Sequence, residues 1–119
     1  MMAKNFRKIA KKLAGQAYRR EQEKALDSLR RDFDRWRSGE IDCWELTDLI
    51  HRFHDGKSRE LYKFYEMGSR EFALARAMAL GILREEEVPA DVQESLRPMI
   101  EYFRNEHAGE DQNPDEETR

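Results

Sequence analysis

The segment Phe72-Ala73-Leu74-Ala75-Arg76-Ala77-Met78-Ala79-Leu80 carries apolar side chains on nearly every side of a helix. A helix with this pattern is buried all round, and its small alanines allow neighbouring helices to approach closely. Ser69 can cap the N-terminus of this helix, and Gly81 can end it. We therefore expect the segment to form the most buried element, at the centre of the fold.

The composition of the whole chain favours helices. Of the 119 residues, 39% are charged and 39% are apolar, and only six are glycine and three proline. Before residue 100, the strand-favouring residues valine and threonine occur only at Thr47, Val88 and Val92. The chain is long enough for one domain with a modest core. The sequence therefore predicts an all-α fold, a small irregular bundle of about five helices with short connections.

Charge is distributed unevenly along the chain, although the net charge is only −3. The N-terminal segment contains no acidic side chain and seven basic ones, namely Lys4, Arg7, Lys8, Lys11, Lys12, Arg19 and Arg20. The acidic segment at the other end is punctuated by glycine and proline and has nothing to bury. We predict a basic amphipathic arm at residues 1–16, a single helical-bundle domain at 17–105 and a disordered acidic tail at 106–119.

The apolar stripe of the arm does not line up with the stripe that follows it. Gly15 lies near the change, so we expect a separate or bent helix at residues 17–37. Asp42 and Glu45 have the spacing of a capping box, in which each residue bonds to the backbone of the other. This pattern predicts the start of a helix at residues 43–54.

Glycine, serine and proline residues mark the other predicted helix ends. Gly39 suits the left-handed conformation that follows many helices. Gly56 is expected to close the next helix, and Ser58 to cap a short helix that ends at Gly68. Pro98 removes a backbone donor within the last helix, so that helix should be kinked there or restart near it.

Two histidines, His51 and His54, form a cluster with site chemistry, because side chains three residues apart on a helix are neighbours. Imidazole nitrogen and carboxylate oxygen together suit zinc, iron or manganese, so a divalent transition metal is a candidate cofactor. The candidate ligands are Asp48, His51, His54, Asp55 and Glu60. A homodimer could complete such a site by symmetry. Helix capping and turn chemistry explain the same residues without any metal.

Aromatic residues crowd the short helix after residue 58 on more than one side. The candidates for a protein interface there are Tyr62, Phe64, Tyr65 and Met67, although a well-filled core would give the same pattern. Trp36 and Trp44 bracket the turn at residues 38–42. We expect both in the core, because each falls on or beside an apolar stripe.

The basic arm could bind several kinds of partner, or none. Its side chains could neutralise the phosphates of a nucleic acid, lie on an anionic membrane, dock on an acidic protein surface or remain solvated. Residues 57–60 could meet a phosphate at a helix N-terminus, although capping by Ser58 explains them as well. No apolar stretch is long enough to span a membrane, and the single Cys43 excludes an intramolecular disulfide. We therefore expect a cytoplasmic protein.

The sequence contains no catalytic motif. We expect a non-enzymatic protein-interaction or regulatory protein that binds a protein partner or a second copy of itself. One alternative is a metal-binding helical protein that uses His51 and His54. Another is an accessory nucleic-acid binder that works through the basic arm.

Overall fold

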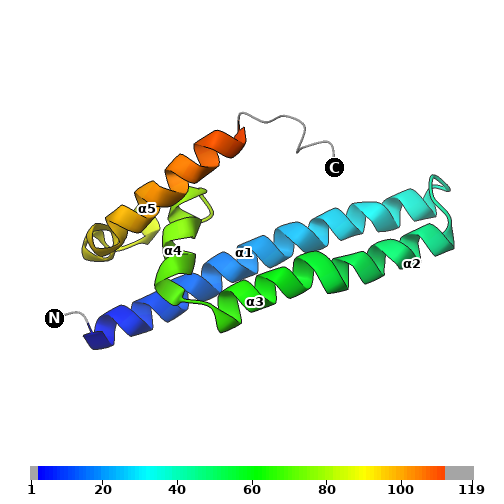
Figure 1. The fold of residues 1–119 in the computed structure, drawn as a ribbon. Coiled ribbons are helices and arrows are strands. Elements are labelled where there is room, and N and C mark those ends of the chain that lie inside the picture. The colour runs from blue at the N-terminus through cyan, green and yellow to red at the C-terminus, as the bar shows by residue number, and fades with distance from the viewer. Residues whose placement is uncertain (1–2, 112–119) are drawn as a thin grey trace. The chain divides into compact units, whose positions relative to one another are not determined.

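The computed structural model describes the backbone of residues 3–111. The α-helices are α1 (Ala3–Arg37), α2 (Cys43–Arg52), α3 (Arg59–Met67), α4 (Arg70–Ala79) and α5 (Ala90–Asp111), with a π-helical turn η1 (Phe53–Ser58) and a 3-10 turn η2 (Glu85–Glu87) (Figure 1). No strand occurs in this part of the chain, which confirms the predicted all-α class. None of these helices combines the length and apolar character needed to cross a membrane.

The chain divides into two compact units. We call Met1–Ala17 together with Ser69–Arg119 the core unit, and Tyr18–Gly68 the hairpin unit. The long helix α1 contributes its first part to the core unit and its remainder to the hairpin unit. The predicted division into an arm, one bundle domain and a tail follows other boundaries and stays a prediction.

Helix α1 is continuous, so the predicted separate helix at 17–37 is wrong. A glycine within a helix costs only about 1 kcal/mol, and a Cβ at Gly15 would meet nothing within 4 Å. The line of apolar side chains changes its direction along α1 because the two parts of the helix pack within different units. Ala10, Leu13 and Ala14 are buried in the core unit, whereas the buried position of the later part is Ala25, in the hairpin unit.

Burial in the core unit is densest along α4. Ala73, Leu74, Ala75 and Ala77 are each at most 1% exposed, as the apolar pattern predicts, whereas Phe72 is 41% exposed, so the prediction of burial on every side is wrong for the start of the segment. The Ser69 hydroxyl accepts a hydrogen bond of 3.2 Å from the Phe72 amide, which confirms the predicted cap.

Helix α5 packs against α4 in the same unit. The ring of Phe103 lies edge-on to that of Phe72, with 4.7 Å between centroids. The helix passes through Pro98 without a restart. It continues to Asp111, so residues 106–111 are helical and the tail predicted from residue 106 is wrong for them; alanine and glutamate there favour a helix. The rest of that tail, residues 112–119, lies outside the described residues.

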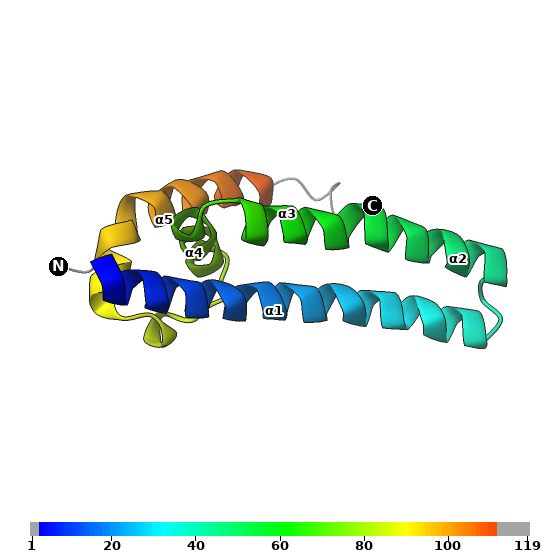
Figure 2. The ribbon, with the colours of Figure 1, turned by 90° about the horizontal axis from the view of Figure 1, so that it is seen from below.

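The hairpin unit places the second part of α1 beside a helical rod formed by α2, η1 and α3 (Figures 1 and 2). The connecting loop follows the prediction. Gly39 has a φ of +85°, and the Glu45 amide donates to the Asp42 carboxylate at 2.8 Å while the Asp42 amide donates to Glu45 at 2.9 Å. The sequence therefore positions this turn by local chemistry alone.

The rod has no break at Gly56, where the sequence predicts a helix end. Gly56 lies inside η1, and Ser58 has a helical φ and ψ with no side-chain cap, so both predictions are wrong. Phe53 and Leu61 are eight residues apart, which would turn them 80° apart in an ordinary α-helix. The π-helical turn η1 has more residues per turn, which removes most of this 80° rotation. Both side chains therefore stay on the packed side of the rod. The described residues thus form four long helical segments, and the predicted count of about five is not confirmed.

Candidate functional site

The hairpin unit leaves large apolar side chains in solvent. Among the described residues, those of this unit that are more than a third exposed are Leu26, Phe33, Trp36, Trp44, Tyr62 and Met67. The prediction that Trp36 and Trp44 lie in the core is wrong, because their exposed fractions are 39% and 76%. Two helices cover only one side of each other, so side chains away from that contact have no third element to pack against.

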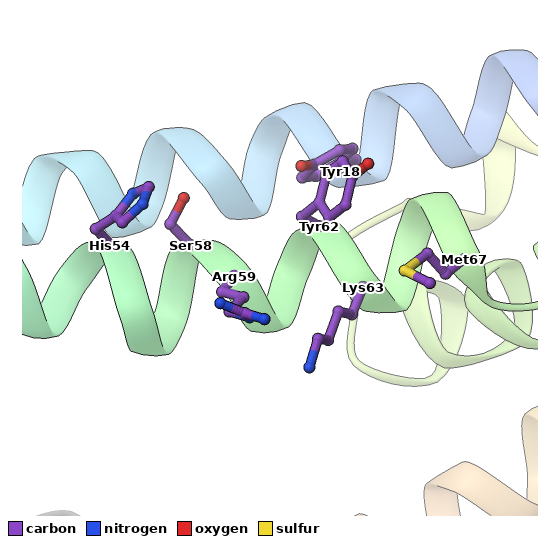
Figure 3. A pocket seen from close by; sticks show the side chains of 7 residues that line it. All are labelled: Tyr18, His54, Ser58, Arg59, Tyr62, Lys63 and Met67. Carbon is purple, nitrogen blue, oxygen red and sulfur yellow. The ribbon is translucent and has the colours of Figure 1, made fainter.

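A pocket of about 540 Å³ opens within the hairpin unit. The residues that line it are Tyr18, His54, Ser58, Arg59, Tyr62, Lys63 and Met67 (Figure 3). One of them comes from α1, and the others come from η1 and α3. The volume falls in the range of about 300–1,000 Å³ typical of ligand-binding pockets. No carboxylate is among the lining side chains, so the pocket has a positive and aromatic character.

The ring of Tyr18 is held in place at one wall of this pocket. It stacks on the ring of Tyr65 with centroids 4.9 Å apart and an angle of 9° between planes. The hydroxyl of Tyr65 donates a hydrogen bond to the carboxylate of Glu21, and Phe64 packs edge-on against the same ring. Tyr65 is only 8% exposed, so it supports the pocket wall from behind.

The four residues predicted for a protein interface therefore occupy two environments. Tyr62 and Met67 line the pocket and are 53% and 72% exposed. Tyr65 is buried, and Phe64 is half-buried. The spacing in the sequence reveals that the helix is aromatic on several sides, but not which side meets α1. The structure supplies that distinction.

Arg59 and Lys63 are the basic side chains of the pocket, and the sequence analysis did not single out Lys63. Figure 3 shows the Lys63 side chain pointing away from α1. Neither has an ion-pair partner among the described residues, although Glu60 and Glu66 are close in sequence. Two like charges four residues apart on a helix destabilise it by about 0.2–0.5 kcal/mol. This like-charge pair was the sequence signal for the positive wall of the pocket.

Four arginines of α1 in the hairpin unit are paired, in contrast, namely Arg19, Arg30, Arg31 and Arg35. Arg30 contacts Asp27 at 3.0 Å and Asp34 at 2.8 Å, and Arg35 contacts Asp32 and Glu40. The hydrogen bond from Arg30 holds the pKa of Asp27 below its ordinary value. Carboxylates therefore balance the charge of these arginines, whereas no carboxylate lines the pocket.

The predicted metal ligands are not gathered by the fold. Within the described residues, no three His, Cys, Asp or Glu side chains form a group that could hold a metal ion. Asp48 instead pairs with Arg52 at 2.7 Å, and His51 is exposed on α2. Of the five candidates, only His54 lines the pocket.

The seven basic residues of the predicted arm lie along α1 in both units. The side chains of Arg7, Lys8, Lys11 and Lys12 are exposed, while that of Lys4 lies outside the described side chains. Arg19 pairs with Glu23 at 3.1 Å. Arg20 is half-buried and engaged in an interaction. Nucleic-acid binding through these residues stays a prediction.

Comparisons with protein-family models, with curated proteins and with solved structures find no match for this chain.

Proposed function

We propose that this protein is a non-enzymatic protein-interaction module whose hairpin unit binds an acidic segment of a partner protein in the pocket. The observation that carries this proposal is the pair of unpartnered cations, Arg59 and Lys63, beside the exposed Tyr62 and Met67.

The chemistry of the pocket fits a segment that carries carboxylates next to an apolar or aromatic side chain. Arginine binds carboxylates through two parallel hydrogen bonds, and lysine attracts them as a point charge. Tyrosine, methionine and arginine are enriched at the centres of protein interfaces. The hydroxyls of Tyr18, Ser58 and Tyr62 offer further hydrogen-bond donors to the same ligand.

A binding role is favoured over catalysis by the way the polar groups are arranged. His54 and Ser58 both line the pocket and are four residues apart, as a base and a nucleophile could be. No hydrogen bond joins these two side chains in the part of the chain that the structure describes. We propose that both side chains contribute hydrogen bonds to the bound segment.

The test is a titration of isotope-labelled full-length protein with two peptides of equal length, followed by NMR. Each peptide contains one tryptophan, flanked by glutamate and aspartate in the first and by lysine and arginine in the second. The acidic peptide should shift the signals of His54, Tyr62 and Met67, whereas the basic peptide should leave them unchanged. Equal shifts with both peptides, or none with either, would contradict the proposal.

A pair of charge reversals separates the pocket from general electrostatics. Lys63→Glu should abolish binding of the acidic peptide, because the positive wall of the pocket is replaced by a negative one. Lys24→Glu makes the same change in net charge at an exposed position of α1 that does not line the pocket. This control should retain binding, apart from a modest loss that added salt screens.

A further inference from the structure

The outer side of the rod, turned away from α1, carries two sets of exposed residues. Leu46 and Leu61 are only 6% and 4% exposed and mark the packed side. Trp44 and Asp48 lie two residues before and two residues after Leu46, which places them about 200° around the helix and hence on the outer side.

The same spacing holds around Leu61. Arg59 and Lys63 lie two residues before and after it, so they share the outer side with Trp44 and Asp48. Figure 3 agrees for Lys63, whose side chain points away from α1.

The two ends of this outer side are complementary in character. The α2 end has the Asp48 carboxylate next to Trp44, which is 76% exposed. The α3 end has the Arg59 and Lys63 cations next to Met67, which is 72% exposed. The rod therefore carries an exposed tryptophan beside a carboxylate, which Arg52 of the same helix also contacts at 2.7 Å, as well as the basic pocket.

We infer that the partner segment belongs to a second copy of this chain, and that two rods pair antiparallel through their outer sides. This inference rests on the proposed function and names the occupant of the same pocket. A two-fold axis near η1 lies midway between Leu46 and Leu61, so it brings the α2 end of each rod level with the α3 end of the other. Both pockets are then filled by one symmetric, closed contact.

The contacts at each end follow from the side chains present. The Asp48 carboxylate of one chain lies level with the Arg59 guanidinium of its partner and forms an ion pair with it. The Trp44 ring enters the pocket between Lys63 and Met67, where the ammonium and the thioether both interact favourably with an indole. The same pair of contacts forms twice, so each change in one residue acts at both ends of the interface.

A second copy is favoured over an unrelated acidic peptide, because one chain carries both the cations of the pocket and an exposed tryptophan beside a carboxylate. The charges of Arg59 and Lys63 repel each other within one chain, and in the dimer each pair faces the Asp48 carboxylate of the other copy.

The experiment is sedimentation equilibrium of the full chain and of two charge reversals, alone and mixed. The natural chain should show a concentration-dependent monomer–dimer equilibrium. Asp48→Arg alone and Arg59→Glu alone should each be monomeric, since each places like charges together at both ends. An equimolar mixture of the two variants should dimerise again, because every contact then joins opposite charges.

Matched controls exclude effects on the fold of one chain. Arg52→Gln removes the ion pair of Asp48 with Arg52 but keeps the Asp48 charge, so the dimer should persist. Trp44→Ala should raise the dimer dissociation constant about tenfold or more. Tyr102→Ala, which removes a 53% exposed aromatic ring from the core unit, should leave that constant unchanged.

The two proposals fail in different ways. A natural chain that stays monomeric, or a variant mixture that stays monomeric, would overturn the second-copy inference even if the acidic peptide binds the pocket. A dimer that survives Asp48→Arg would also overturn it, because another surface would then be responsible. Failure of the peptide titration at concentrations where the natural chain is monomeric would overturn the proposed function itself.

Discussion

The core unit and the hairpin unit use similar helices but finish their packing differently. In the core unit, α4 buries five of its ten residues, and Leu74 is completely buried. In the hairpin unit, two helical segments share one contact, and the residues opposite that contact, such as Trp44, remain in solvent. This difference indicates that the buried fraction of a helix depends more on the number of elements packed around it than on its apolar content.

The largest test of this comparison is to create a cavity. Leu74→Ala should lower the free energy of unfolding by about 2–5 kcal/mol, because close packing on all sides prevents the site from collapsing. Leu26→Ala in the hairpin unit removes the same atoms from a side chain that is 46% exposed, and should cost far less. Urea unfolding gives both values. Equal losses would contradict the difference in packing between the units.

A smaller effect should come from the hydrogen bond that stabilises the hairpin unit. Tyr65→Phe keeps the ring that stacks on Tyr18 but removes the hydroxyl that donates to Glu21, and should cost about 1.5 kcal/mol. Tyr62→Phe removes an exposed hydroxyl and serves as the control. Thermal unfolding followed by circular dichroism would reveal whether the two variants differ as expected.

The capping box at the start of α2 should contribute slightly less. Asp42→Ala removes the acceptor of the Glu45 amide and should destabilise the hairpin unit by about 1 kcal/mol. Asp55→Ala deletes another exposed carboxylate of the rod that makes no such cap. Hydrogen exchange of the α2 amides should increase only in the first variant, and a similar increase in both would point to a general charge effect.

The smallest change should be a slight loss. Lys63→Glu replaces the repulsion with Arg59 by an attraction, but it also places a carboxylate three residues from both Glu60 and Glu66, and should destabilise the hairpin unit by about 0.5 kcal/mol at low salt. The same substitution is expected to abolish binding of the acidic peptide. Denaturation midpoints measured at low and high salt test the sign, since screening should remove the loss. A gain of stability would mean that the contact with Arg59 outweighs the repulsion from the two glutamates.

The parts of the fold that local chemistry determines could be predicted from the sequence. The capping box of Asp42 and Glu45 and the left-handed Gly39 depend on neighbours within a few positions, and the burial of residues 73–75 is visible as a run of apolar side chains. Gly15 and Gly56 look like helix ends for the same local reason. Each costs only about 1 kcal/mol within a helix, and packing of the flanking residues outweighs that cost.

The candidate site was harder to predict because it depends on distant residues. Tyr18 meets the side chains of η1 and α3 only after the chain has turned at residues 38–42. The exposed aromatic residues also look like core residues in the sequence. Trp44 is large and lies beside an apolar stripe, but the sequence does not reveal whether a third helix covers it. The unpaired Arg59 and Lys63 were visible as a charge pattern, although their role depends on which side of the rod they occupy.

The division of α1 between the units also sets an order of folding. Every contact within the hairpin unit joins residues that have been synthesised by residue 68, so it can form while the rest of the chain is still being made. The core unit must wait for α5 and must close a loop that contains the whole hairpin. An N-terminal fragment ending at residue 68 would leave Leu13, Ala14 and Ala17 without their eventual neighbours, and a chaperone would meet the nascent chain at that apolar stripe.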